Sequence, residues 1–213
     1  MGINCYTALA NSTKLLLSWH RFMASLVVAT GNLGKLKELQ EYLVGLDWTL
    51  TLKPEDLEVE ETGATFLENA VLKASQVARA TGQWAIADDS GLEVEALDGA
   101  PGIFSARYGS SDSERIQRLL TELGNELNRE ARFVCAIVVA SPDGAIALSA
   151  EGICPGRILH QPRGSGGFGY DPIFYVPEQR LTFAEMPYEL KHRISHRGRA
   201  MERLLPQLKS LAF

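Results

Sequence analysis

Apolar residues recur with two different spacings along the first third of the chain. The unbroken apolar run of SLVVAT, 25–30, predicts a buried strand, whereas the three-to-four-residue apolar spacing of 36–46 predicts an amphipathic helix. An acidic loop follows. Thr65 and Glu68 then have the spacing of a capping box in front of NAVLKASQVARATG, 69–82, which predicts the start of a second helix.

The middle of the chain has the pattern of strands. Gly82 suits the end of the second helix, and WAIAD, 84–88, predicts a short buried strand. The alternation in GLEVEAL, 91–97, predicts a half-exposed strand. RFVCAIVVA, 132–140, and AIALSAEGI, 145–153, flank the turn sequence SPDG, and this combination predicts a β-hairpin.

Glycine and proline mark two long loops, at 99–109 and 162–172. Residues 113–123 have a helical pattern, and another begins at about Glu185 and is interrupted in ISHRGRA, 194–200. Helices interleaved with strands, together with one hairpin, predict an α/β chain with a mixed sheet. We expect one compact unit, which could be divided into two lobes.

Composition narrows the class of protein. The chain has 213 residues, 46% of them hydrophobic, and a net charge of −5, which argues against a general nucleic-acid binder with a basic face. No apolar stretch approaches the ~20 residues that span a bilayer, so no membrane partner is expected. Cys5, Cys135 and Cys154 lack metal-ligand spacing, and buried reduced thiols of a cytoplasmic protein are the expectation.

The first 22 residues differ from the rest. They contain no acidic residue, and their apolar core at Leu15–Leu17 is too short for a secretory signal. We interpret 1–22 as an upstream start or an appended segment outside the fold, with a transit peptide as the alternative. The folded domain is therefore expected at 23–213.

A glycine-containing turn follows the first predicted strand. In TGNLGK, Thr30 to Lys35, glycines allow backbone N–H groups to approach an anion, and the next helix N-terminus and Lys35 add positive charge. The turn is not a Walker loop, because two residues rather than four separate its glycines and Leu36 follows the lysine. Phosphate binding is the functional interpretation, and an ordinary strand-to-helix turn is the alternative.

Without a hydroxyl after that lysine, metal ligands must come from elsewhere. Glu60-Glu61 closes the acidic loop 54–63, and Asp88-Asp89 enters a glycine turn at a predicted strand end. Adjacent acids are costly to bring together unless a cation compensates. The alternative for Glu60-Glu61 is a solvated acidic loop. The alternative for Asp88-Asp89 is a turn or helix cap. Lys73, among apolar neighbours on the second helix, has a snorkelling surface lysine as its alternative.

Two later segments could recognise a base. Phe168 and Tyr170 stand in the glycine-rich loop GGFGYDPIF, which could enclose a planar ring with Asp171 as an acceptor. Aromatic residues in loops also serve as core anchors. KHRISHRGRA, 191–200, gathers hydrogen-bond donors around Gly198, and a solvated basic helix face is the alternative.

Together these segments resemble the inosine/xanthosine triphosphate pyrophosphatase family, in its bacterial-type branch. The motifs that carry the resemblance are ATGNLGK at 29–35, EETGATFLENAVLKA at 60–74, ADDSGLEVEALDGAPGIFSARYG at 87–109, GGFGYDPIF at 166–174 and SHRGRA at 195–200.

The resemblance implies a role for each matching residue. Glu61 and Asp89 would bind Mg²⁺, and Asp89 would also accept a proton from the attacking water. The expected substrate-binding residues are Thr30, Gly31, Asn32, Leu33, Gly34 and Lys35 at the triphosphate, Lys73 near the phosphates, Ser90, then Phe168, Gly169, Tyr170 and Asp171 around the base and sugar, and Lys191, His196 and Arg197 completing recognition.

The resemblance covers Leu26 to Leu211 and also implies the architecture: an elongated α/β unit with a long mixed sheet, helices on both sides and an active-site cleft between two lobes. Family members are usually homodimers. The implied reaction is Mg²⁺-dependent hydrolysis of ITP, dITP and XTP to the monophosphate and pyrophosphate. A nucleotide-binding sensor without turnover, and a pyrophosphatase for other modified nucleotides, are the alternatives.

Base choice has a physical basis in this interpretation. Hypoxanthine and xanthine present an oxygen at position 6, where adenine presents an amino donor. Donors from His196 and Arg197 would pair with the oxygen and leave adenine unmatched, and mismatches of this kind discriminate on the order of 10⁴-fold.

Overall fold

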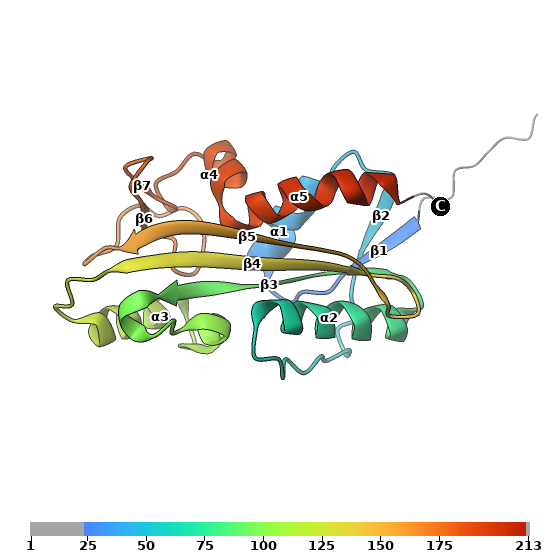
Figure 1. Cartoon of the computed structure of the whole chain (residues 1–213), viewed down its shortest axis with the longest axis horizontal. Coiled ribbons are helices and arrows are strands. Elements are labelled where there is room, and N and C mark those ends of the chain that lie inside the picture. The colour runs from blue at the N-terminus through green and yellow to red at the C-terminus, as the bar shows by residue number, and fades with distance from the viewer. Residues whose placement is uncertain (1–23, 212–213) are drawn as a thin grey trace, which may run out of the picture.

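The structure, a computed structural model, describes residues 24–211, so the expected extension at 1–22 lies outside the described residues. The described part contains a seven-stranded sheet in the order β2-β1-β3-β4-β5-β6-β7 (Figure 1). The strands are β1 (Ala24–Val28), β2 (Trp48–Leu52), β3 (Trp84–Val94), β4 (Glu130–Ala140), β5 (Ile146–Ile158), β6 (Phe174–Val176) and β7 (Leu181–Thr182).

The sheet is mixed, as predicted. β1 pairs in parallel with β2 and β3, whereas each neighbouring pair from β3 to β7 is antiparallel. The predicted hairpin is β4–β5, and these two long strands with β3 give the molecule its elongated shape (Figure 1).

Helices cover both faces of the sheet. α1, α4 and α5 lie on one face, and α2 and α3 lie on the other (Figure 1). The helices are α1 (Leu33–Leu43), α2 (Phe66–Thr81), α3 (Asp112–Leu123), α4 (Tyr188–Ile194) and α5 (His196–Ser210), with 3-10 turns η1 (Glu95–Leu97) and η2 (Gly102–Arg107).

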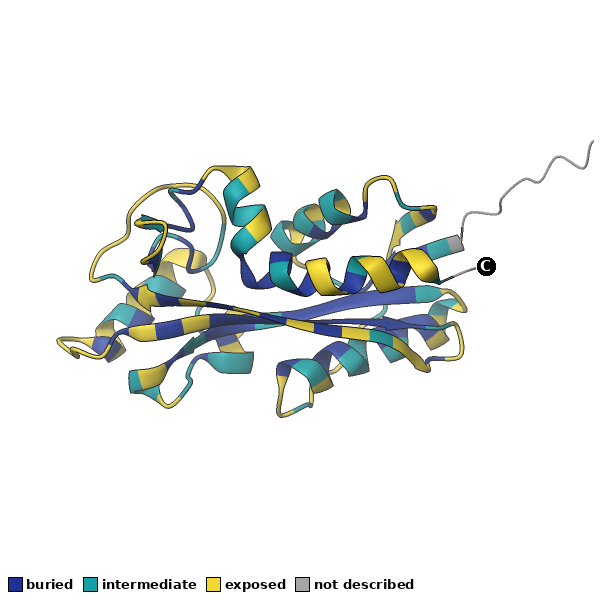
Figure 2. Ribbon diagram, turned by 45° about the horizontal axis from the view of Figure 1, so that its top comes forward, coloured by how far each residue is buried: buried dark blue, intermediate teal, exposed yellow. Residues whose placement is uncertain are grey.

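Burial on both faces explains the apolar run of β4. Successive side chains of a strand point to opposite faces, so Cys135 and Ile137 join the core under α1 and α5, while Ala136 and Val138 join the core under α2. β5 instead alternates buried and exposed positions over most of its length. Buried positions are concentrated in the middle of the sheet (Figure 2).

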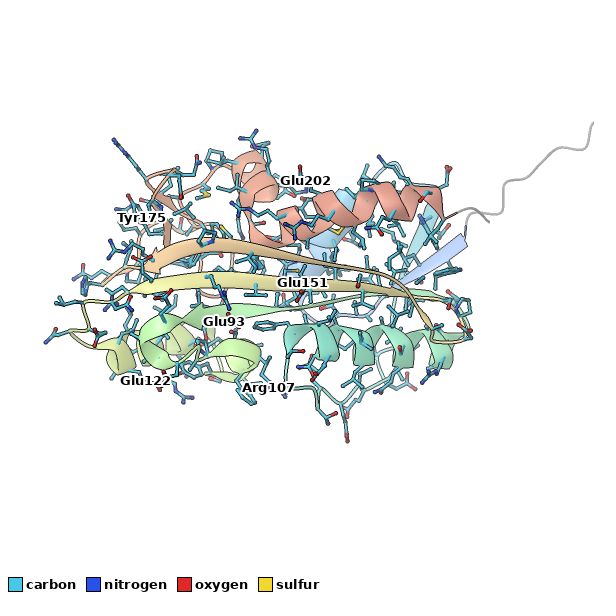
Figure 3. The ribbon with its side chains drawn as sticks, in the orientation of Figure 1. Glu93, Arg107, Glu122, Glu151, Tyr175 and Glu202 are labelled. Carbon is cyan, nitrogen blue, oxygen red and sulfur yellow. The ribbon has the colours of Figure 1, made fainter. Side chains whose placement is uncertain are left out.

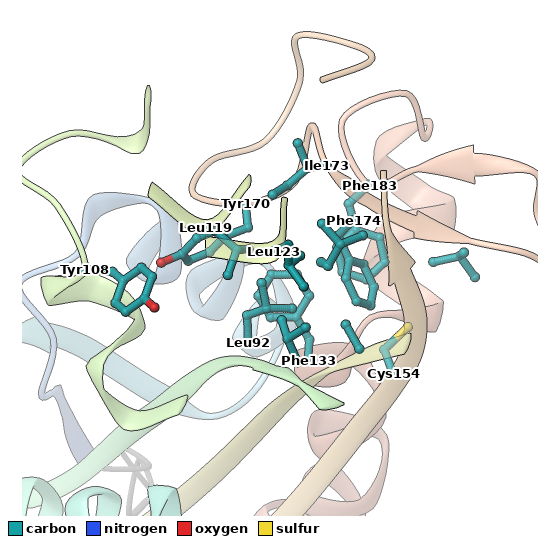
Figure 4. Packing of buried hydrophobic residues seen from close by; sticks show 14 of the residues in the cluster. Leu92, Tyr108, Leu119, Leu123, Phe133, Cys154, Tyr170, Ile173, Phe174 and Phe183 are labelled. Atoms are coloured by element: carbon teal, nitrogen blue, oxygen red, sulfur yellow. The ribbon is translucent and has the colours of Figure 1, made fainter. Parts of the chain in front are cut away.

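A third apolar cluster supports the loop 162–172. The ring of Phe133 stacks on Phe183 at 5.6 Å between centroids and meets Phe174 edge-on at 4.6 Å. Tyr170 is buried in the same cluster (Figure 4), and its hydroxyl donates to the carbonyl of Ser105 over 2.9 Å. The glycine-rich loop is therefore anchored at one end of the sheet.

β3 extends beyond the end of its neighbour β1. The β1–β3 ladder ends at the pair Val28 and Ile86, yet β3 continues to Val94. The stretch Asp88–Gly91 of β3 therefore borders loops on that side, while it remains paired to β4 on the other. Side chains from several loops can therefore lie against this unpaired edge of β3, which forms one wall of a cleft.

Local signals fixed the ends of α2 correctly. Thr65 accepts a hydrogen bond from the backbone N–H of Glu68 over 3.1 Å, and the Glu68 carboxylate accepts one from the N–H of Ala64 over 2.7 Å. Gly82 ends the helix in the left-handed conformation, with φ of 65°. Both predictions are confirmed.

The structure adds one strand and corrects one prediction. β2, with the alternating pattern WTLTL, was not predicted, because the strand has only five residues. Asp88–Gly91 is not a turn but the middle of one continuous strand, β3. The predicted interruption of the C-terminal helical pattern within 194–200 is confirmed and lies at Ser195, between α4 and α5. Ser195 caps α5 by accepting from the N–H of Gly198 over 3.1 Å, so Gly198 lies inside that helix and is not the residue that breaks it.

Gly152 allows α5 to approach β5 closely. A Cβ atom there would lie 2.1 Å from the carbonyl oxygen of His196 and 2.4 Å from the amide nitrogen of Ala200. We expect Gly152→Ala to lower the free energy of unfolding by about 1–3 kcal/mol, because backbone atoms would have to move. Ser149→Ala, at an exposed position of the same strand, should change it by less than about 0.5 kcal/mol in urea unfolding. Equal stability of the two variants would contradict this role.

Candidate functional site

The turn between β1 and α1 is shaped by two side chains. Asn32 caps α1 by accepting from the N–H of Lys35 over 3.1 Å, and Thr30 accepts from the N–H of Asn32 over 3.2 Å. The helix therefore begins at Leu33, earlier than its apolar pattern indicates, and Lys35 lies in the first turn. A Cβ on Gly31 would meet nothing within 4 Å, so the backbone here is open to a ligand.

Asp88 is completely buried and carries two cationic partners. Lys35 Nζ lies 2.7 Å from Oδ1, and Arg197 Nε lies 2.9 Å from Oδ2. The thiol of Cys135 also lies 2.9 Å from Oδ2. Burial by itself raises the pKa of Asp88, but Arg197 and Lys35 together hold it well below the ordinary 3.8. Asp88 therefore joins β3, α1 and α5 through charge.

Asp89 points to the opposite face of β3, as its neighbouring position in a strand requires. Lys73 on α2 donates to Asp89 Oδ1 over 2.8 Å, to Glu61 Oε1 over 3.0 Å and to the carbonyl of Asp88 over 2.8 Å. Lys73, whose side chain is only 11% exposed, is thus an ion-pair partner inside the protein, and the snorkelling alternative is wrong. Arg107, on the α2 and α3 side of the sheet (Figure 3), holds the other oxygen of Glu61 at 2.9 Å.

The two carboxylates fit a divalent cation. Glu61 and Asp89 come from different elements and meet at one nitrogen, and Asp89 Oδ2 is buried without a hydrogen-bond partner. Burial raises the pKa of Asp89, and Lys73 opposes that rise. Mg²⁺ takes one or two protein carboxylates together with substrate phosphates and water. Residues 24–211 contain no group of three or more His, Cys, Asp or Glu side chains that could hold a metal ion.

The loop carrying Phe168 is tied to both α4 and α1. Asp171 accepts from the N–H of Phe168 over 3.0 Å and pairs with Lys191 Nζ at 2.6 Å. Lys191 also pairs with Glu38 at 3.0 Å and lies 4.9 Å from the centre of the Phe168 ring. A Cβ on Gly34 would come within 2.7 Å of that ring, so any larger residue there would displace the Phe168 ring.

His196 is a buried neutral histidine. Burial, followed by the charge of Arg197, lowers its pKa well below the usual 6.5. Its ring stacks on Phe133 at 4.6 Å with an interplanar angle of 11°, and its Nδ1 is buried without a partner. A neutral imidazole has one donor and one acceptor nitrogen, so His196 can still form a hydrogen bond with a ligand.

The donors of Arg197 are largely occupied. Nε and Nη2 donate to Asp88, Nη2 also donates to Ser90 over 3.1 Å, and Nη1 donates to Glu38. A guanidinium has five N–H groups, so one at most remains for a ligand. The main contacts of Arg197 in this structure are therefore with the protein itself.

Two adjoining pockets open along this wall. One, which we call the aromatic pocket, is lined by Phe133, Phe168, Gly169, Tyr170, Asp171, Lys191, His196 and Arg197, among others. The charged pocket is lined by Thr30, Gly31, Lys53, Glu61, Lys73 and Asp89, among others. Four residues line both: Asn32, Lys35, Ser90 and Ala106. The protein is therefore an α/β protein with two joined pockets. The aromatic pocket suits a planar group, and the charged pocket suits an anionic tail joined to it.

All but two of the residues to which the resemblance assigns a role line one of these pockets. Leu33 is 79% exposed and lines neither pocket, and Gly34 packs against Phe168 rather than lining a pocket. Sequence reasoning missed Glu38 and the pairing role of Asp88. Glu38 lies one helical turn after Lys35, on the same face of α1, which is the signal that could have found it.

The sequence profile of the Ham1 family matches residues 26–207, and the chain belongs to that family. A protein of Nostoc sp. named dITP/XTP pyrophosphatase is 68% identical over 186 residues, which cover 87% of this chain and 95% of the relative. A protein of Synechocystis sp. with the same name is 60% identical over 191 residues, covering 90% and 98%. The resemblance inferred from the motifs is thereby confirmed.

Solved structures show the same fold. A HAM1 protein from Coxiella burnetii superposes with a TM-score of 0.81 at 44% identity, covering 87% of this chain and 98% of that one. The Ham1 protein of Staphylococcus aureus gives a TM-score of 0.80 at 43% identity, covering 88% and 100%.

We expect Asp88→Asn to cost about 3–5 kcal/mol of unfolding free energy, because it leaves Lys35 and Arg197 without their shared anion. The folded-state pKa of Asp88 is depressed, so its contribution is present above the unfolded-state pKa and is lost as the pH falls through the folded-state value. The difference from wild type should hold from about pH 8 to 5 and shrink below about pH 4.

Urea unfolding across that pH range measures the effect. Asp98→Asn is the control, because Asp98 is exposed at a positive φ of 51°, where asparagine is well tolerated. A difference of less than about 1 kcal/mol at pH 7, or one that grows on acidification, would contradict the assigned pairing.

Proposed function

We propose that this protein hydrolyses the non-standard purine nucleoside triphosphates ITP, dITP and XTP to the monophosphate and pyrophosphate, and so cleans the nucleotide pool. The observation that carries the proposal is the meeting of Glu61 and Asp89 at Lys73, beside the turn that holds Lys35. The cyanobacterial relatives at 60–68% identity are named dITP/XTP pyrophosphatases, which supports the same assignment.

The two pockets suggest how the substrate lies. The base fits the aromatic pocket, where Phe168 offers a ring face and Asp171 and Lys191 supply polar groups. The triphosphate fits the charged pocket. Lys35 and Ser90 line both pockets, so the sugar and α-phosphate belong at the junction.

We further propose Mg²⁺ as the cation held by Glu61 and Asp89. When bound there, it would polarise the phosphoryl oxygens and acidify a water. In this proposal Asp89 orients the attacking water and takes its proton, which is supported by the lack of a hydrogen-bond partner for its buried Oδ2. Lys35 and Lys73 stabilise the charge that gathers on the leaving pyrophosphate, and stabilisation that grows toward the transition state accelerates the reaction.

Discrimination among bases rests chiefly on His196 in this proposal. His196 lines the aromatic pocket and its Nδ1 is buried without a hydrogen-bond partner, whereas Arg197 has at most one N–H to offer. In this proposal the ring nitrogen of His196 that faces the base carries the proton, since a donor there matches the 6-oxygen of hypoxanthine or xanthine and opposes the 6-amino group of adenine. This assignment shifts most of the predicted base recognition from Arg197 to His196.

Assembly and location are proposals as well. We propose that the protein is a cytoplasmic homodimer without a nucleic-acid partner. Its described cysteines, Cys135 and Cys154, are free and buried, in line with a reducing compartment. No helix within 24–211 has the length and apolar character needed to cross a membrane.

A nucleotide panel tests the activity. With Mg²⁺, we expect wild type to release pyrophosphate, not orthophosphate, from ITP, dITP and XTP in preference to ATP, GTP and pyrimidine triphosphates. Asp89→Asn should lower kcat by at least about 100-fold while the unfolding transition stays cooperative. Asp98→Asn is the matched control and should retain full activity. Binding without turnover would favour the sensor, and a pyrimidine preference would favour another pyrophosphatase.

His196→Phe tests base recognition. Phenylalanine keeps an aromatic ring next to Phe133 and Phe183 but removes both ring nitrogens. We expect the ratio of kcat/KM for ITP to kcat/KM for ATP to fall by at least about tenfold, since a site that hydrogen-bonds a substrate group discriminates strongly against its absence. Steady-state kinetics with both nucleotides measure the ratio. An unchanged ratio would mean that His196 does not read the base.

A further inference from the structure

Lys53 follows the last residue of β2, close to the turn that contains Thr30. Its backbone N–H donates to the carbonyl of Val28 over 3.3 Å, which places Lys53 level with the end of β1. Lys53, Thr30 and Gly31 all line the charged pocket. The carboxyl ends of parallel strands are where open α/β sheets bind their ligands, so Lys53 has the position of a ligand-binding residue.

The ammonium group of Lys53 has different partners from those of Lys35 and Lys73, the other two lysines of the charged pocket. Its Nζ donates to the carbonyls of Leu57, over 2.7 Å, and Pro54, over 3.3 Å. Within 24–211 no carboxylate lies at ion-pair distance from it, whereas Lys35 pairs with Asp88 and Lys73 with two acids. An ammonium has three donors, so Lys53 has a donor left over and a charge that no acid neutralises.

The position of Lys53 along the cleft indicates which part of a substrate it meets. Lys35 lines both pockets, but Lys53 lines only the charged pocket, together with Leu57 and Glu58. If the base occupies the aromatic pocket, the anionic tail extends away from Lys35. Lys53 then lies among the residues toward the end of that tail.

We propose that Lys53 binds the terminal phosphates of the substrate and is a specificity-determining residue for a polyphosphate tail. This inference rests on the proposed function, which it deepens. A charge-assisted hydrogen bond from the ammonium to a phosphate oxygen is short and strong. Because those phosphates leave as pyrophosphate, Lys53 recognises the leaving group, while Asp171 and His196 recognise the base end.

Calorimetric titration tests the inference without requiring turnover. Inorganic tripolyphosphate and inosine monophosphate are each titrated, with Mg²⁺, into wild type, Lys53→Met and Lys53→Arg. Lys37→Met is the matched control, because Lys37 is exposed on α1 and lines neither pocket. We expect Lys53→Met to weaken tripolyphosphate binding by about tenfold or more and monophosphate binding by less than about twofold. Lys53→Arg should retain most of the affinity, and Lys37→Met all of it.

The outcomes separate this contact from a structural role and from the proposed reaction. Equal weakening of both ligands by Lys53→Met would mean that Lys53 only holds the loop after β2, and unchanged tripolyphosphate affinity would mean no contact. Either result overturns the inference, as does a wild type that binds no tripolyphosphate. Selective loss of tripolyphosphate binding in a protein that hydrolyses no nucleotide would uphold the contact and refute the reaction. Lys53→Gln replaces the methionine variant if that one does not unfold cooperatively.

Discussion

The ion cluster around Asp88 is the constraint on which the cleft depends. Asp88 comes from the central strand β3, Lys35 from α1 and Arg197 from α5, and each is buried or nearly so. Charges removed from water are tolerated only where every partner is in place. Glu38 and Lys191 extend the same network to α4 and, through Asp171, to the loop of Phe168. The positions of the elements around the cleft therefore depend on this network of charges.

The geometry of β3 gives the adjacent residues Asp88 and Asp89 different surroundings. Because neighbouring side chains of β3 point to opposite faces, Asp88 enters the α1 and α5 side and Asp89 the α2 side. The first has all its acceptor oxygens occupied, while the second keeps Oδ2 without a partner. Asp88 is thereby suited to hold the structure together and Asp89 to act on a ligand. A turn at this position could not have separated them in this way.

The features that were predicted correctly from the sequence are those that depend on interactions between residues close together in the chain. The capping box at Thr65, the helix end at Gly82 and the hairpin around SPDG depend on residues within a few positions, and each is confirmed. The interpretation of Asp88–Gly91 as a turn was wrong because its composition is typical of turns, whereas the outcome was decided by β4 and by cations far along the chain. Lys73 and Arg197 are 16 and 109 residues from the acids that they pair with. Such pairing overrides local propensity.

Pairing also explains how the cleft can be rich in charge and still suit a polyanion. Lys35, Lys73 and Lys191 are each held by carboxylates within 3.0 Å, so their positions are fixed before any ligand arrives. Donors fixed in advance need no reorganisation during a reaction, which is where their electrostatic effect is greatest. The same pairing reduces the net charge that these lysines offer to an anionic tail, so a cationic group without an acidic partner would add to their attraction for it. Motifs reveal which residue types gather at this cleft, but only the three-dimensional pairing shows which charges remain available.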